Sequence, residues 1–293
     1  MFKAIGALSA RRAPWFTWGS SVVLGVGAVF LLGGWAGSAT RPHSATRSGA
    51  RPSGKAPPTL SDECGNAYAG IASTSIWFRT ADHVRLHGII LGGGRAGVLL
   101  AHQYPADLCG WAPYGRTLAR SGFRVLFFDF RGFGASQRPP PRLIGRVDRD
   151  VIAAAALLRE RGAKTVSLVG ASFGAAAVLV AAPAIHPPPS AVVSLSAETD
   201  LEFLGPNYSL HPLRAAPRLR SPLLLMVARG DHFVSVGDSR ALLRAARANP
   251  KRLVVFGSGH GLRLLEPPNR ARASRLLLAF LRAHGRPGAT SAR

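Results

Sequence analysis

The stretch that decides the predicted fold is Val166-Ser167-Leu168-Val169-Gly170-Ala171-Ser172-Phe173-Gly174. Its first four residues form a mostly apolar run typical of a buried strand, and the small-residue segment from Phe173 to Ala182 is typical of a helix. Ser172 therefore falls in a sharp strand-to-helix turn. The glycines beside it let strand and helix approach closely, because they carry no Cβ. This short pattern is weak on its own in a chain with 33 glycines, so its context must support it.

Short apolar runs alternate with longer amphipathic segments from about residue 75 to residue 284, as in an α/β fold. The predicted strands are Ile76–Arg79, Val84–Leu91, Val98–Ala101, Val125–Phe128, Val166–Val169, Val192–Leu195, Leu223–Val227 and Leu253–Phe256. The predicted helices are Tyr114–Arg120, Val147–Arg161, Phe173–Ala182, Val236–Ala248 and Asn269–His284. Most of these strands are continuously apolar, which indicates a parallel sheet. We therefore predict a mostly parallel, doubly wound sheet with helices on both faces, and an edge hairpin formed by the first two strands.

The first forty residues have the layout of a membrane-targeting segment. Basic residues precede an aromatic patch at Trp15, Phe16 and Trp18, and an uncharged, largely apolar run from 19 to 40 follows. The run is long for the core of a signal peptide and rich in glycine for a transmembrane helix, so a cleaved signal and an uncleaved anchor both stay open. Gly37-Ser38-Ala39 offers small residues for cleavage. We expect an exported protein, either anchored in the membrane through this segment or secreted after cleavage.

These features predict four parts of the chain. Residues 1–40 are the signal or membrane anchor, and residues 41–62 are a disordered, basic linker rich in Pro and Ser. Residues 63–286 form the α/β domain, and residues 287–293 are a disordered tail. The sequence does not indicate an oligomeric state.

The chain carries a formal net charge of +23 and contains 37 Lys and Arg residues. Such a charge suits an anionic membrane surface or a nucleic acid as a partner. No basic recognition helix, zinc-ligand spacing or aromatic RNA-binding motif accompanies it, so we expect no specific nucleic-acid partner. A solvated basic surface explains the charge.

Three residues, each in the loop after a different strand, have the chemistry of a nucleophilic site. A serine hydroxyl needs a base within hydrogen-bond reach and a carboxylate to orient that base. Asp231 follows the strand Leu223–Val227, and His260 follows the last strand. Because the carboxyl ends of parallel strands meet at one edge of the sheet, Ser172, Asp231 and His260 are expected to lie together, as nucleophile, orienting acid and base.

Each of these residues also has a simpler interpretation. Ser172 would then be an ordinary turn serine and His260 a loop histidine. Asp231 or Asp238 would cap the following helix. The rival acids for orienting the histidine are Glu198 and Asp200, which follow the strand that ends at Leu195.

Two further segments resemble those of α/β-hydrolases. His102-Gln103-Tyr104 is similar to the family's His-Gly-x segment, with Gln103 in place of the usual glycine. Asp129-Phe130-Arg131-Gly132-Phe133-Gly134-Ala135-Ser136 resembles the family's Asp-x-Arg-Gly-x-Gly-x-Ser loop, in which Asp129 and Arg131 would organise the loop. The resemblance implies an oxyanion hole formed by the backbone N–H groups of Phe173 and Tyr104.

The same resemblance implies hydrolysis of a carboxylic ester or related acyl bond through an acyl-enzyme, with a small-molecule ester or acyl substrate and no cofactor or metal. The stretch from Ser196 to Arg220 is too short for a helical cap domain. We expect an open site with a small lid loop around Phe203 to Tyr208, as in esterases and dienelactone-hydrolase-like enzymes. A peptidase or acyltransferase on the same scaffold is one alternative. A non-catalytic envelope protein with a hydrolase fold is another.

Cys64 and Cys109 are the only two cysteines in the chain. A disulfide between them is the natural hypothesis for an exported protein, and two unpaired thiols are the alternative. The bond would tie the start of the folded domain to the loop after an early strand. Closing a loop of this length contributes about 4 kcal/mol in the chain-entropy model.

Overall fold

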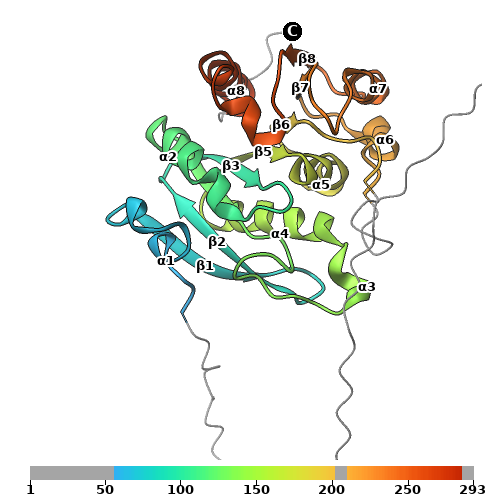
Figure 1. The fold of residues 1–293 in the computed structure, drawn as a ribbon. Coiled ribbons are helices and arrows are strands. Elements are labelled where there is room, and N and C mark those ends of the chain that lie inside the picture. Colours follow the sequence, from blue (N-terminus) through green and yellow to red (C-terminus); the bar gives the residue numbers. More distant parts are fainter. Residues whose placement is uncertain (1–55, 202–209, 286–293) are drawn as a thin grey trace, which may run out of the picture. The chain divides into compact units, whose positions relative to one another are not determined.

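The computed structural model describes residues 56–201 and 210–285, and these ranges contain one eight-stranded sheet (Figure 1). Its spatial order is β1-β2-β4-β3-β5-β6-β7-β8. The strands are β1 (Ser73–Arg79), β2 (Arg85–Leu91), β3 (Ala96–Ala101), β4 (Arg124–Phe128), β5 (Thr165–Ala171), β6 (Ala191–Leu195), β7 (Leu223–Ala228) and β8 (Lys251–Phe256). Strand β2 pairs antiparallel with β1 and β4, and every other pairing is parallel. The predicted edge hairpin and the mostly parallel sheet are both confirmed.

Helices cover both faces of the sheet, and each face has its own apolar core. The α-helices are α1 (Leu60–Cys64), α2 (Ala112–Arg120), α3 (Pro141–Ile144), α4 (Val147–Glu160), α5 (Phe173–Ala181), α6 (Pro212–Ala215), α7 (Val236–Ala245) and α8 (Arg270–Gly285). Leu118 of α2 and Leu277 of α8 belong to one core, and Leu158 of α4 and Leu242 of α7 belong to the other. Figure 1 shows α5 beside α4, next to the middle of the sheet. The fold is therefore doubly wound, as predicted.

The folded part begins earlier than the sequence predicts. The linker was expected to extend to residue 62, but helix α1 already starts at Leu60, whose side chain is buried. Thr59 and Asp62 form a reciprocal capping box at its start. A helix of five residues leaves too short a periodic pattern to recognise in a segment rich in Pro and Ser. The predicted signal or anchor (1–40), most of the linker and the tail (287–293) lie outside the described residues.

The bond between Cys64 and Cys109 is present and joins the end of α1 to the turn Leu108–Trp111. The predicted pairing is therefore confirmed.

The loop after β4 is held by a buried arginine, as predicted. Arg131 is fully buried and pairs with Asp150 of α4 at 2.7 Å and with Asp82 at 2.8 Å. Asp129 accepts backbone hydrogen bonds from Leu108 and Ala135. These contacts attach the loop to α4, to the β1–β2 turn and to the disulfide-bonded turn.

Most predicted elements are present, with ends shifted by a few residues. The largest difference in a helix is α7, predicted to reach Ala248 but ending at Ala245. None of the helices in the described ranges is long and apolar enough to cross a membrane.

Candidate active site

Ser172 occupies a strained turn between β5 and α5. Its backbone has a φ of 48° and a ψ of −115°, an arrangement that an L-residue adopts only when its surroundings enforce it. A Cβ on Gly170 would lie 2.2 Å from the carbonyl oxygen of Gly174, and a Cβ on Gly174 would lie 2.3 Å from that of Ala101. Both positions thus require glycine. The close approach raises the Ser172 hydroxyl above the carboxyl edge of the sheet.

His260 and Asp231 complete a continuous chain of hydrogen bonds with Ser172. The Nε2 atom of His260 lies 2.8 Å from the Ser172 Oγ, and its Nδ1 atom lies 2.9 Å from both carboxylate oxygens of Asp231. The three residues come from the ends of β5, β7 and β8, as the sequence predicts. Parallel neighbours in the sheet bring them together across 88 residues of chain.

The Asp231 carboxylate is held by hydrogen bonds within its own loop as well as by His260. One of its oxygens accepts the backbone N–H groups of Phe233 at 2.9 Å and Val234 at 3.1 Å. Burial by itself would raise the pKa of Asp231, but hydrogen bonds from His260 and from the backbone N–H of Phe233 outweigh it and lower that pKa. Asp231 is therefore held as a carboxylate facing the imidazole.

The candidate acids differ in their contacts. Helix α7 begins at Val236 and is capped by Ser235 and Asp238, so Asp231 is not its cap. Asp200 pairs with His211 at 2.6 Å. Glu198 lines the cavity in front of Ser172 but makes no hydrogen bond to His260 among the described contacts.

A cavity of about 910 Å³ opens in front of Ser172 and His260. Two aromatic residues at its wall, Tyr104 and Phe233, are 44% and 72% exposed, and they are the only large apolar side chains so exposed in the described part of the chain. The Phe233 ring packs on the His260 ring with centroids 4.8 Å apart. Exposed rings gathered at a cavity indicate a binding surface.

The two residues expected at the oxyanion hole lie at this site. Phe173 is the first residue of α5, directly after Ser172, and Tyr104 lines the cavity in the loop after β3. Their role as backbone donors stays a prediction. The lid expected around Phe203 to Tyr208 lies outside the described residues. In the rest of Ser196–Arg220 the only helices are α6 and the short turn Ala216–Arg218, which fits the predicted absence of a large cap.

Gln103 joins the loop after β3 to the loop of His260, a contact that sequence reasoning missed. Its Oε1 accepts a hydrogen bond from the backbone N–H of Leu262 at 2.9 Å. Gly261, with a φ of 54°, leaves room for this side chain, since a Cβ there would lie 2.3 Å from the same oxygen. The departure from the family's glycine at Gln103 was the available signal, but a single sequence does not say what the longer side chain contacts.

One group of three residues in the described ranges has the composition of a metal site. Glu63, His87 and Asp129 bring their ligand atoms within 4.8 Å of one another. The Nδ1 atom of His87 lies 3.2 Å from Glu63 and 3.6 Å from Asp129, while its Nε2 lies 2.9 Å from the hydroxyl of Ser75. Burial lowers the pKa of His87, but hydrogen bonds with Asp129 and Glu63 outweigh it and raise the pKa to about 9. The arrangement is thus that of an imidazolium at ion-pair distance from two carboxylates.

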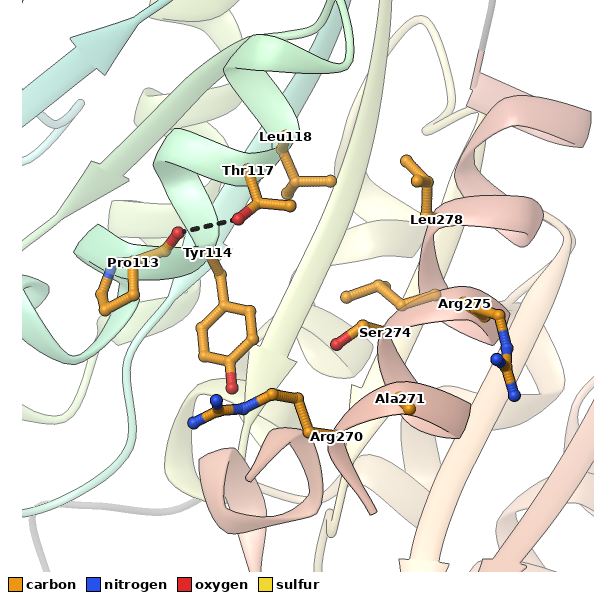
Figure 2. A pocket seen from close by; sticks show the side chains of 10 residues that line it. Pro113, Tyr114, Thr117, Leu118, Arg270, Ala271, Ser274, Arg275 and Leu278 are labelled. Carbon is orange, nitrogen blue, oxygen red and sulfur yellow. Dashed lines mark hydrogen bonds between the residues drawn. The ribbon is translucent and has the colours of Figure 1, made fainter. Parts of the chain in front are cut away.

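A second cavity, of about 500 Å³, lies between α2 and α8 (Figure 2). Its lining is largely apolar, and Figure 2 shows the Arg270 side chain beside the Tyr114 hydroxyl at one end. The cavity shares no lining residue with the one at Ser172. It therefore does not contribute to the candidate active site.

Known proteins share this fold. A family model described as the alpha/beta hydrolase fold matches residues 98–212. An esterase of Pyrococcus furiosus superposes with a TM-score of 0.66 at 20% identity, and the match covers 79% of this chain and 98% of the esterase. The chain has the α/β-hydrolase fold.

Two relatives match this chain in sequence. A protein of Mycobacterium tuberculosis described as uncharacterized is 29% identical over 214 residues, which cover 64% of this chain and 73% of that protein. Bifunctional epoxide hydrolase 2 of Sus scrofa is 44% identical over 57 residues, which cover 20% of this chain and 10% of that enzyme. The chain thus matches only about a tenth of the length of the epoxide hydrolases.

The hydrogen-bond chain from Ser172 to Asp231 is able to move a proton. With Asp231 accepting the Nδ1 proton, the Nε2 atom of His260 is free to accept the proton of the Ser172 hydroxyl. The serine oxygen then becomes a nucleophile toward an electrophile in the cavity. The protonated imidazole can return that proton to a leaving group.

Proposed function

We propose that this protein is a serine hydrolase that cleaves a carboxylic ester or related acyl bond of a small molecule through an acyl-enzyme. The observation that supports the proposal best is the chain from Ser172 to His260 to Asp231, with both contacts of the imidazole between 2.8 and 2.9 Å. Ser172 attacks the acyl carbon while His260 takes its proton. The ester C–O bond then breaks, and His260 gives the proton to the departing alcohol. Water, activated by the same histidine, hydrolyses the acyl-enzyme, which releases the acid and restores the Ser172 hydroxyl.

The surroundings of Ser172 support acyl transfer. Ser172 directly precedes the N-terminus of α5, where backbone N–H groups and the helix dipole favour a developing oxyanion. The backbone N–H groups of Phe173 and Tyr104 are the proposed donors. The cavity in front of Ser172 is large enough for a small-molecule ester.

An active-site label tests the proposal directly. A fluorophosphonate phosphonylates a serine only when a base activates it, so the wild-type protein is expected to take up one equivalent and Ser172→Ala none. Ser194→Ala is a matched control, because Ser194 is a buried serine within strand β6 and does not line the cavity. No uptake by the wild type, or equal uptake by Ser172→Ala, would contradict a serine nucleophile and favour the non-catalytic alternative.

A second experiment separates the esterase from the peptidase or acyltransferase. Hydrolysis of nitrophenyl esters is compared with that of aminoacyl nitroanilides, and added alcohols are tested as acyl acceptors. We expect ester hydrolysis to have the higher kcat/KM. Faster amide cleavage, or acyl transfer to alcohol that exceeds transfer to water, would overturn the esterase assignment while leaving the nucleophile in place.

A further inference from the structure

Glu198 is an acid in the active-site cavity that the proposed mechanism does not use. It follows β6 by three residues, is half-buried, and lines the same cavity as Ser172 and His260. Within the described residues no hydrogen bond or ion pair to its carboxylate is formed, whereas Asp200 on the same loop and Asp231 on the loop after β7 each pair with a histidine. Glu198 is thus an unpaired, half-buried acid among the residues that line this cavity.

The burial of Glu198 makes an unpaired carboxylate costly once that space is filled. Burial raises the pKa of Glu198, the charge of His260 lowers it, and the charge of Asp231 raises it again. A substrate that covers the carboxylate removes more of its water. A positive charge on the substrate compensates for this loss best, while a negative charge there is repelled.

The aromatic walls of the cavity favour the same kind of ligand. Phe233 and Tyr104 expose their rings at this cavity, and the face of an aromatic ring attracts an ammonium group. A carboxylate together with exposed rings is the combination that recognises organic cations.

We propose that Glu198 is a specificity-determining residue that selects esters carrying an ammonium group, with Phe233 and Tyr104 supplying ring contacts to it. The inference rests on the proposed ester hydrolysis and names its substrate class. It concerns a charge set apart from the ester bond, in either the acyl or the alcohol part.

Two basic side chains, those of Arg263 and His232, also line this cavity. Both Arg263 and His232 are exposed, and His232 directly follows Asp231 in the chain. Neither forms an ion pair with Glu198 among the described contacts. Solvent screens exposed charges more strongly than half-buried ones, so the local field at Glu198 favours a cation although the whole chain is basic.

Pairs of esters that differ only in charge test this inference. In one pair the nitrophenyl ester of trimethylammonio-butyrate is compared with its neutral tert-butyl isostere. In the other, acetylcholine is compared with the acetate ester of dimethylbutanol, which replaces the nitrogen by carbon. We expect the wild type to prefer the cation in at least one pair by about tenfold in kcat/KM, and Glu198→Gln to remove that preference.

The ratio within each pair cancels any effect of the substitution on the chemical step. Glu266→Gln is the matched control, because Glu266 is exposed, does not line the cavity, and changes the net charge equally. No preference in either wild-type pair, or a preference that survives in Glu198→Gln, would overturn the inference. If the wild type hydrolysed none of the four esters and took up no fluorophosphonate, the proposed function itself would fail.

Discussion

The proposed role of Asp231 is to orient His260, and it rests on the contact with the Nδ1 atom of the imidazole. We predict that Asp231→Asn lowers kcat by about 10³- to 10⁴-fold, since an amide stabilises the wrong tautomer of the imidazole and does not neutralise the imidazolium. Asp238→Asn is the control, because Asp238 only caps α7. Steady-state kinetics on a nitrophenyl ester decide the point, and a loss of less than tenfold in Asp231→Asn would place the orienting acid elsewhere.

Gln103 positions the loop that carries His260. Its hydrogen bond to the backbone of Leu262 holds the loop that follows His260 against the loop that carries Tyr104. The side chain fills space that Gly261 leaves open. One contact therefore couples the base to the expected oxyanion donor.

We predict that Gln103→Ala slows fluorophosphonate labelling and lowers kcat by about tenfold with little change in KM, because the loss of one hydrogen bond loosens the base. Gln103→Glu retains an acceptor oxygen for Leu262 and is expected to keep more of the activity. The melting temperature serves as the control for stability. An unchanged labelling rate in Gln103→Ala would show that the two loops are positioned by other contacts.

At the scale of elements, α1 and the first two strands are held by a buried charge cluster. His87 of β2 lies between Glu63 of α1 and Asp129 of the loop after β4, and the disulfide closes beside it at Cys64. The cluster thus attaches the start of the folded domain to the loop that Arg131 organises.

This cluster predicts a pH dependence of stability. The pKa of His87 is raised to about 9 in the folded protein, against an ordinary value of 6.5. A raised pKa contributes stability that is fully present below pH 6.5 and is lost as the pH rises through 9. For His87 this amounts to about 3 kcal/mol, and urea unfolding at a series of pH values measures it.

Glu63→Gln is the matched variant for this measurement, because it removes one of the two carboxylates at His87 and leaves the disulfide intact. Its free energy of unfolding is expected to fall less steeply between pH 6.5 and 9 than that of the wild type. Parallel pH profiles for the two proteins would mean that Glu63 does not stabilise the charged imidazole.

At the scale of the whole molecule, we propose that the protein is exported, through a signal or membrane anchor in residues 1–40. The apolar run that follows the basic start of the chain supports this proposal. The bonded pair Cys64–Cys109 supports it too, since disulfides persist in oxidising compartments.

We predict that the full chain, expressed in bacteria, is recovered in the membrane fraction or is released with a new N-terminus near Ala39. Fractionation followed by fluorophosphonate labelling and N-terminal sequencing measures both outcomes. A variant with Leu31 and Leu32 replaced by Asp is the control, because charges in the apolar run oppose insertion. Recovery of the wild-type chain from the cytosol with its original N-terminus would contradict export.

The order of elements and the positions of Ser172, Asp231 and His260 could be predicted from the sequence. Apolar runs and glycines report local backbone geometry, and residues after parallel strands meet at one edge whatever the details of packing. The elements that escaped prediction are short ones such as α1 and α3, whose four or five residues leave no readable period. Tertiary contacts with the disulfide and with the loop after β4 support them instead.

The sequence by itself determined the doubly wound fold, the strand-to-helix turn at Ser172 and the candidate partners of that serine, because these depend on local periodicity and chain order. Only the tertiary structure shows which of Asp231, Glu198 and Asp200 contacts His260, since all three follow strands and differ in where the chain turns after the strand. It also decided that Gln103 contacts the loop of His260 and that His87 lies between two carboxylates. These contacts join residues far apart in the chain, and their geometry depends on side-chain packing that no local pattern contains.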